Sequence, residues 1–303
     1  FETTISASRL DVAKAILSNV RVLRDYGYTG KTPEIVDTAP KIGKSTVVWE
    51  RRRIDGAAGY YLSLEALNGS VENTDRTSSP AFVANGGEPL RFRVVALTGD
   101  TPLTGIPLSA LLSNEAGSDA RLRNALAFLA YEEKLLAGSW QYNTYFGRDT
   151  LMSIALLGGA LRPVAVEAGI GGVLDRLSAT GEVAHEEDIS EYALLRRRNE
   201  GSPESDDPIL DYKMIDDDFM LAPVLASYLL DTPEGGARAG AFLSRSSPSG
   251  AVYRDLVRRN LDYVINMARP YGAKPRWSNL VRLRSDDPPV GEWRDSNAGL
   301  GGG

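Results

Sequence analysis

The spacing of apolar residues changes once along this chain of 303 residues, near residue 115, and that change limits the folds open to it. Between residues 30 and 112, short runs rich in β-branched and aromatic residues are separated by Gly, Asp, Asn and Pro. Runs of this kind are typical of antiparallel strands. We predict strands at 45–54, 59–67, 81–85 and 90–97. The result is a small β-sandwich-like module, and apolar spacing predicts an amphipathic helix ahead of it at residues 8–25.

After residue 115, apolar residues recur at spacings of three and four, which predicts helices. We expect helices at 119–138, 149–161, 162–178, 217–231 and 252–270. Pro223 interrupts the fourth helix and Pro270 closes the fifth. The predicted organisation is therefore an N-terminal helix plus a β-sandwich-like module in residues 1–114, followed by a helical domain in residues 115–303.

The links between the predicted helices alternate in character. Several carry aromatic, acidic and other polar residues in unusual density. These are the links at 138–149, 180–198, 209–218 and 291–303. The links at 161–163 and 232–239 lack such residues. If the helices form hairpins around a ring, the polar links fall on one rim, as in an (α/α) barrel with its site at one end.

Composition excludes several classes of function. The net charge of -6 argues against nucleic acid or an anionic membrane as the main partner. No apolar run reaches the 18 residues that a membrane helix needs. The chain has no cysteine and one histidine, which argues against a metal site built on Cys or several His residues, and we expect no metal and no cofactor. Oxygen-only ligation of Ca²⁺ near His185 stays open as an alternative. The compartment stays open, with a lean towards secretion because Phe1 would fit a trimmed signal peptide.

One polar link leads into an apolar helix with two adjacent charges, Arg148 and Asp149, behind Tyr145. Arg and Asp side chains can hold sugar hydroxyls through paired hydrogen bonds, and aromatic rings can stack on the apolar faces of sugars. An aspartate at the start of a helix is also a good cap. Our hypothesis is that the pair binds sugar hydroxyls from a rigid helix start.

Three segments resemble (α/α)6-barrel glycosidases. "YFGRDTLMS" resembles the GRDT loop in the glucosidase part of glycogen-debranching enzymes, and "DYKMIDDDFMLAPVLASYL" resembles a later segment of that group. "GEWRDSNAGLGGG" is similar to the Trp-Asp-Ser loop of trehalase-like glucosidases, although Arg294 stands between the Trp and the Asp here. The resemblance covers roughly residues 125–303. It implies a mainly α fold with an (α/α)6 barrel, and an O-glycosyl hydrolase that cleaves an α-glucosidic bond by inversion.

The resemblance also assigns the acids. It gives the role of general acid to Asp295, and a carboxyl beside the indole of Trp293 would have its pKa raised by desolvation, as that role requires. Glu292 is a second candidate. Asp216 is the alternative acid, because its distance from Tyr212 matches the acid of debranching enzymes. Three adjacent aspartates at 216–218 cannot all face one pocket, so we expect at least one helix cap and one solvent-facing side chain.

The remaining candidates would bind substrate. Arg148 and Asp149 are expected to hold the sugar beside the scissile bond, and His185 and Glu186 to contact sugar hydroxyls, although a plain surface turn explains the latter two equally well. Stacking surface is expected from Trp140, Tyr145 and Trp293.

Two alternatives to hydrolysis remain, a catalytically inactive carbohydrate-binding or scaffold protein and a glycoside phosphorylase. The length also matters, because twelve barrel helices need well over 300 residues and the part after the β module has room for five to seven. We therefore expect the barrel to be incomplete here and completed elsewhere, for example by a second chain.

Overall fold

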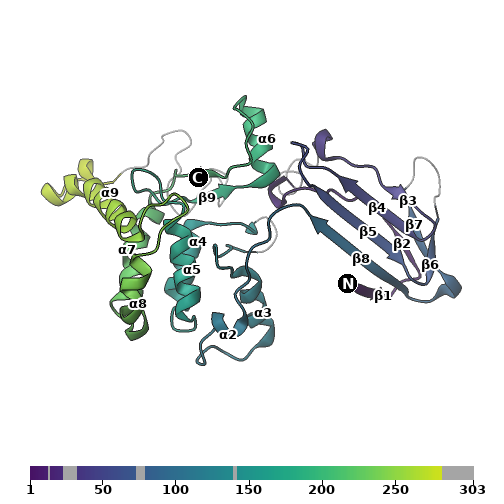
Figure 1. The fold of residues 1–303 in the computed structure, drawn as a ribbon, viewed down its shortest axis with the longest axis horizontal. Helices are drawn as coiled ribbons and strands as arrows, with labels where there is room; N and C mark the ends of the chain where they lie inside the picture. The colour runs from purple at the N-terminus through teal and green to yellow at the C-terminus, as the bar shows by residue number, and fades with distance from the viewer. Residues whose placement is uncertain (13, 23–32, 73–78, 139–141, 282–303) are drawn as a thin grey trace. The chain divides into compact units, whose positions relative to one another are not determined.

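The computed structural model describes residues 1–12, 14–22, 33–72, 79–138 and 142–281 (Figure 1). The chain divides into two compact units. The first, here called the strand unit, consists of Phe1–Pro102 and Ile189–Pro208. The second, here called the helical unit, consists of Leu103–Asp188 and Ile209–Gly303.

The strand unit contains two antiparallel sheets. The larger has the strand order β1-β8-β5-β4-β3 and the smaller has the order β2-β7-β6. The strands are β1 (Glu2–Ile5), β2 (Arg9–Asp11), β3 (Lys41–Ile42), β4 (Thr46–Arg51), β5 (Tyr60–Ala66), β6 (Gly69–Glu72), β7 (Ala81–Ala84) and β8 (Leu90–Thr98). Short 3-10 turns lie at η1 (Glu34–Val36) and η2 (Asn85–Gly87).

Side chains that alternate along the strands build the core of this unit. Val47 and Trp49 point inward from β4, as Leu90 and Phe92 do from β8. Phe82 of the smaller sheet meets Phe92 of the larger one edge to face, with ring centroids 4.9 Å apart. The two sheets therefore share one apolar core, as the period of two in the sequence requires.

Helix α6 (Ser190–Glu200) belongs to the strand unit although it lies far along the chain. Its Glu191 is fully buried and forms a two-pronged ion pair with Arg51 of β4, with Nη1 2.8 Å from Oε1 and Nη2 on Oε2. The amide of Ile54 and the hydroxyl of Ser18 also donate to this carboxylate, at 3.0 and 2.6 Å. These bonds fasten α6 to the strands.

The helical unit holds the remaining elements. Its helices are α2 (Leu108–Leu111), α3 (Ala120–Leu129), α4 (Gly147–Leu157), α5 (Pro163–Leu174), α7 (Asp216–Leu229), α8 (Pro233–Leu243), α9 (Tyr253–Ala273) and the short η4 (Trp277–Asn279). Two short strands, β9 (Glu186–Asp188) and β10 (Ile209–Asp211), pair antiparallel.

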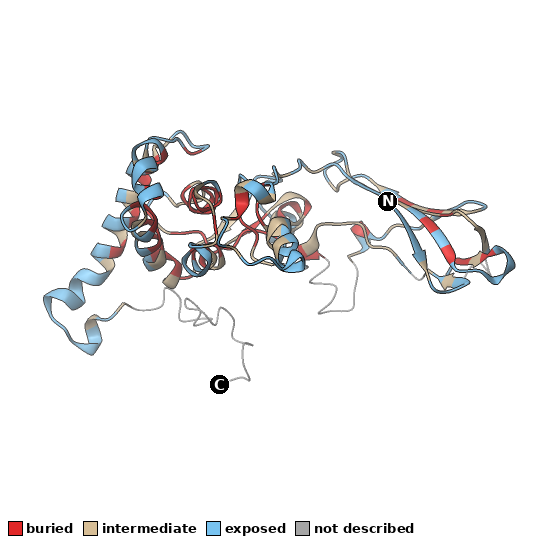
Figure 2. Ribbon diagram, turned by 90° about the horizontal axis from the view of Figure 1, so that it is seen from below, coloured by how far each residue is buried: buried red, intermediate tan, exposed pale blue. Residues whose placement is uncertain are grey.

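Helix α5 is the centre of this unit, because every residue from Ala165 to Leu174 is buried. Helices α4, α7, α8 and α9 pack against it, and their apolar faces complete the core (Figure 2). Pro163 at the first position of α5 is compatible with a helix start, where its missing N–H has no partner to lose. No helix in the described ranges is long and apolar enough to cross a bilayer.

The predicted fold class is wrong. Of the residues that the structure describes, 41% are helical and 21% are in strands, and they include a five-stranded antiparallel sheet. The fold is therefore mixed α/β and not mainly α with an (α/α)6 barrel. The periodicity of a sequence specifies helices, but it does not specify that they close into a ring. Closure depends on which faces pack together, and here α4, α7, α8 and α9 gather around a single central helix.

Two local predictions are also corrected. The helix expected at residues 8–25 is wrong over Arg9–Asp11, which forms β2. Leu10 opposes Phe82 of β7 and packs on the core, so tertiary pairing overrides the helical spacing there. The helix expected at 119–138 ends at Leu129, and Ala130 instead pairs with Leu135 in an isolated bridge.

Candidate functional site

Three of the polar links meet where α4 and α7 begin. The backbone N–H of Gly147 donates to the carbonyl oxygen of His185 at 2.7 Å, and Phe146 bridges to Glu186. The N–H of His185 in turn donates to the carbonyl of Asp211 at 2.7 Å. Backbone bonds therefore bring together parts of three polar links in the helical unit, at residues 146–147, 185–186 and 211.

Glycine is required at the start of α4. A Cβ at Gly147 would lie 2.3 Å from the carbonyl oxygen of Ala184 and 2.9 Å from the side chain of Val183. Any other residue would push the helix away from the strand-like segment that it pairs with. The glycine in the "GRDT" pattern thus allows the close approach that sets the position of Arg148, the next residue of α4.

Arg148 and Asp216 lie 68 residues apart in sequence and form an ion pair, with Nη1 3.3 Å from Oδ2. Arg148 is in the first turn of α4 and Asp216 begins α7, so two helix N-termini lie side by side at this pair. The Arg148 side chain is 11% exposed and that of Asp216 is 27% exposed, so water and ligands can reach the carboxylate.

A second group of charges lies on β9, on β10 and directly after β10. Lys213 contacts the carboxylate of Asp211 at 2.6 Å and that of Glu186 at 3.7 Å, and all three side chains are partly exposed. We call Arg148, Asp216, Glu186, Lys213 and Asp211 the α4–α7 cluster. Lys213 and Asp211 were missed by the sequence analysis, although both lie inside a polar link that it had marked.

His185 and Asp217, the sequence neighbours of Glu186 and Asp216, form a buried pair. Nδ1 of His185 is 3.0 Å from Oδ2 of Asp217, and both side chains are almost fully excluded from solvent. Burial raises the pKa of Asp217, and the hydrogen bond to His185 opposes that rise. The other oxygen of Asp217 has no hydrogen-bond partner within the described part of the chain. His185 also packs edge to face on Phe146, with centroids 5.6 Å apart.

The three adjacent aspartates therefore have three environments. Asp216 is partly exposed and binds Arg148, and Asp217 is buried against His185. Asp218 is fully buried and accepts the backbone N–H of Val183 at 2.7 Å. Asp216 is thus the one that can reach a ligand, and the cap position of α7 is taken by Ile215.

Buried ion pairs hold strand β9, which carries Glu186, in place. Glu187 of β9 is 1% exposed and binds Lys134, and its second oxygen accepts from Nε of Arg176 at 2.7 Å. Burial alone would raise the pKa of Glu187, but the charges of Arg176 and Lys134 outweigh it and hold this pKa below its ordinary value. These two cations fix the strand that carries Glu186.

Some predicted residues are placed where they cannot serve as expected. Tyr145 is fully buried, with the guanidinium of Arg176 4.6 Å above its ring centre, so it offers no stacking surface to a ligand. Burial also raises its pKa well above the ordinary value. Asp149 lies half-buried in the first turn of α4 and is not its cap, a position that Phe146 holds. Trp140, Glu292, Trp293 and Asp295 lie outside the described residues.

The chemistry that the described residues offer is that of polar binding and proton transfer. They contain no group of three or more His, Cys, Asp or Glu side chains arranged to hold a metal ion. The α4–α7 cluster presents a guanidinium, an ammonium and three carboxylates on segments that backbone bonds join. Such a set can hold hydroxyl groups and move a proton.

Comparisons with known proteins give no further guidance. No protein-family model, curated protein or solved structure matches this chain.

Proposed function

We propose that the α4–α7 cluster binds a carbohydrate and takes part in hydrolysing an α-glucosidic bond. The observation that carries this proposal is the pairing of Arg148 with Asp216 at two adjacent helix starts. A guanidinium and a partly exposed carboxylate match the donors and acceptors of a neutral sugar.

Rigid support is the second argument. Gly147, the residue before Arg148, is bonded through its N–H to the carbonyl oxygen of His185. Asp217, the residue after Asp216, is bonded to the side chain of the same histidine. Groups that are held in place before a ligand arrives need no further ordering when the reaction starts. The site is therefore suited to catalysis as well as to binding.

Arg148 donates to Asp216, so the carboxylate already acts as an acceptor. We therefore assign Asp216 the part of the base in an inverting reaction, in which it removes a proton from the attacking water. A separate acid then donates a proton to the glycosidic oxygen as the bond from the anomeric carbon to that oxygen breaks. Asp295 is the proposed acid and Glu292 the second choice, both on the strength of the sequence resemblance.

The test compares Asp216→Asn, Asp295→Asn and the wild type on two kinds of substrate. One is a panel of α-linked glucose disaccharides and glycogen oligomers. The other is α-glucosyl fluoride, whose leaving group needs no proton. Asp216→Asn should lower kcat about 10²–10⁴-fold on both kinds, whereas Asp295→Asn should lose the natural linkages and keep the fluoride. Product anomers are followed by NMR.

Asp255→Asn is the matched control, because Asp255 is an exposed acid in the first turn of α9. It should leave turnover unchanged. Wild-type turnover by Asp216→Asn on both substrates would refute the proposal. Sugar affinity without any product in the wild type would favour the non-catalytic binding protein, and product that forms only with added phosphate would favour a phosphorylase.

A further inference from the structure

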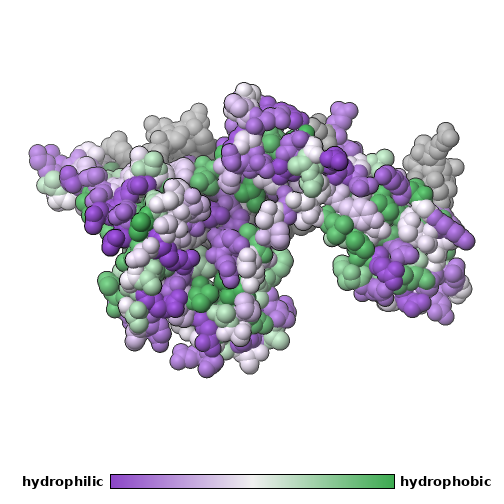
Figure 3. Space-filling view, in the orientation of Figure 1, coloured by the Kyte–Doolittle hydropathy of each residue, from purple (hydrophilic) through white to green (hydrophobic). Residues whose placement is uncertain are grey.

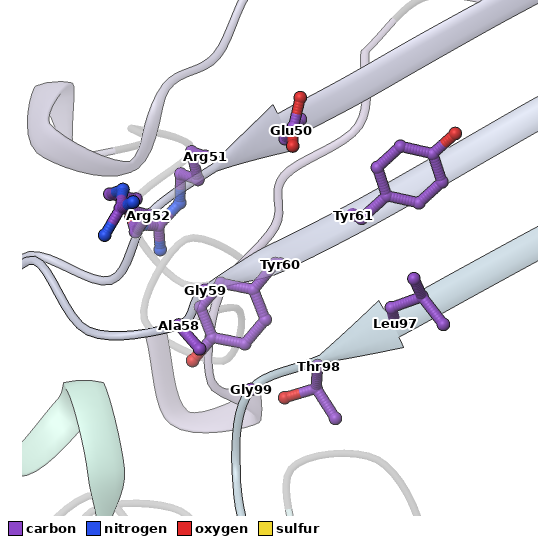
Figure 4. Close-up of a pocket in the computed structure, with 10 residues that line it drawn as sticks. All are labelled: Glu50, Arg51, Arg52, Ala58, Gly59, Tyr60, Tyr61, Leu97, Thr98 and Gly99. Carbon is purple, nitrogen blue, oxygen red and sulfur yellow. The ribbon is translucent and has the colours of Figure 1, made fainter.

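A groove with a volume of about 650 Å³ lies on the strand unit, at the end where β4, β5 and β8 come together (Figure 4). The α4–α7 cluster contributes nothing to it, since every lining residue belongs to the strand unit. This volume is within the range of sites that bind small molecules.

Its central feature is a row of three side chains across three strands. Glu50 of β4 is opposite Tyr61 of β5, and Tyr61 is opposite Leu97 of β8. The residues that alternate with them, such as Trp49 and Leu62, point into the core, so this row faces outward. In Figure 4 the ring of Tyr61 lies between the carboxylate of Glu50 and the side chain of Leu97.

Leu97 is 61% exposed and lies beyond the part of β8 that pairs with β1. Hydrophobic side chains gather over β8 on the face that Figure 3 shows, beside hydrophilic ones. The aromatic ring and the leucine together form a flat apolar surface. Glu50 places a carboxylate beside this surface, and Arg52 lines the groove further along, towards Ala58 (Figure 4).

Two glycines form the end of the groove. The N–H of Gly99 donates to the carbonyl of Gly59 at 2.7 Å, and the backbones approach very closely there. A Cβ at Gly59 would lie 2.1 Å from the carbonyl oxygen of Arg51, and one at Gly99 would lie 2.3 Å from that of Ala58. Glycine is therefore required at both positions, because the backbones approach too closely there for a side chain.

We propose that this groove is a second carbohydrate-binding site, which holds one or two sugar rings without cleaving them. The apolar face of a sugar ring stacks on an aromatic ring, and its hydroxyl groups need donors and acceptors at the edge. Tyr61 with Leu97 supplies the first, and Glu50 with Arg52 supplies the second. Glu50 contacts Lys41 at 3.1 Å in an exposed pair, and such a pair is weak enough for a hydroxyl to replace.

The lining of the groove carries the carboxylate of Glu50 and the guanidinium groups of Arg51 and Arg52. Arg51 is paired with Glu191 and Glu50 with Lys41, so polar groups of both signs are available to the hydroxyl groups of a sugar. The proposal stands on these residues alone and does not depend on hydrolysis at the α4–α7 cluster.

The experiment is native affinity electrophoresis of the full chain in gels with and without glycogen, together with calorimetric titration of maltoheptaose. The wild type should be retarded by glycogen. Tyr61→Ala should weaken the binding to glycogen at least tenfold, whereas Tyr61→Phe should keep it, because stacking needs the ring and not the hydroxyl. Glu50→Gln should weaken it several-fold while leaving the ring in place.

Tyr271→Ala, at an exposed tyrosine of α9, is the matched control and should bind as the wild type does. Tyr61→Ala should weaken the binding by the same factor in the Asp216→Asn background as in the wild type, which separates this groove from the proposed hydrolytic site. Wild-type retardation of both Tyr61→Ala and Glu50→Gln, or no retardation of the wild type, would overturn the proposal. So would sedimentation showing that Tyr61→Ala turns a dimer into a monomer, since that would assign the face to self-association.

Discussion

At the scale of single residues, burial decides what each charge can do. Asp216, Asp217 and Asp218 are identical and adjacent, yet the first reaches solvent and the other two are fully buried. The sequence showed that they could not act alike, because successive residues of a helix point in different directions. It did not show which one would be exposed, since that depends on the segment from 183 to 185 that packs over them.

Glu187 offers a prediction at this scale. Glu187→Gln keeps the shape of the side chain but leaves the buried charges of Lys134 and Arg176 without their carboxylate. The free energy of unfolding at pH 7 should fall by about 3–5 kcal/mol in urea titration. Glu234→Gln, at an exposed glutamate of α8, should change it by less than about 0.5 kcal/mol.

The pH dependence of this difference follows from the lowered pKa of Glu187. A group with a lowered pKa in the folded state stabilises the protein above its ordinary pKa, about 4.3, and loses that contribution as the pH falls through the folded value. The gap in stability between the wild type and Glu187→Gln should therefore shrink below about pH 4. A gap that is constant down to pH 2 would contradict this account.

At the scale of elements, helices persist through residues that normally end them. Pro223 stands inside α7 and Pro270 inside α9, although the sequence suggested an interruption at the first and an end at the second. In α7, the residues around Pro223 are held by the core, which Leu221, Val224 and Leu225 enter. Packing therefore outweighs the local cost of the proline.

Pro223→Ala tests that cost. The substitution restores an N–H that can donate to the carbonyl of Phe219 and removes the clash of the ring. The unfolding free energy should rise by about 1–3 kcal/mol, measured by thermal and urea unfolding. Pro233→Ala is the control, because Pro233 is at the first position of α8 and replaces no helical hydrogen bond, so its effect should stay within about 0.5 kcal/mol. A loss of stability in Pro223→Ala would contradict the conclusion that the proline carries a local cost which packing outweighs.

At the scale of the whole molecule, the chain crosses between its two units. Residues 189–208 leave the helical unit in sequence and belong to the strand unit in space. The buried pair of Arg51 and Glu191 is the main bond that holds α6 there. Residues far apart in sequence therefore determine the composition of each unit.

Arg51→Met tests this organisation. It removes the guanidinium and leaves the fully buried Glu191 without its cation, which should cost about 3–5 kcal/mol. Hydrogen exchange followed by mass spectrometry should speed up in residues 1–102 and 189–208 but not in α5. Arg93→Met, at an exposed arginine of β8, should have an effect below about 1 kcal/mol. Faster exchange in α5 and unchanged exchange in α6 would refute the conclusion that Arg51 and Glu191 hold α6 in the strand unit.

Much of the local structure could be predicted from the sequence. The strands expected at 59–67 and 90–97 are confirmed as Tyr60–Ala66 and Leu90–Thr98, and the helix expected at 162–178 contains Pro163–Leu174. The link that carries Arg148 and the link that carries Asp216 were both marked as polar and unusual. Periodicity and turn residues encode such features within ten or twenty positions.

The sequence by itself determined where the chain is helical or extended and which segments carry charge, because those properties depend on neighbouring residues. Tertiary structure alone decided that the helices surround α5, that Arg9–Asp11 is a strand, that Tyr145 is buried and that Arg148 meets Asp216. Each of these depends on which distant surfaces fit and exclude water together. That choice is made by the free energy of the whole chain, which no short window of sequence contains.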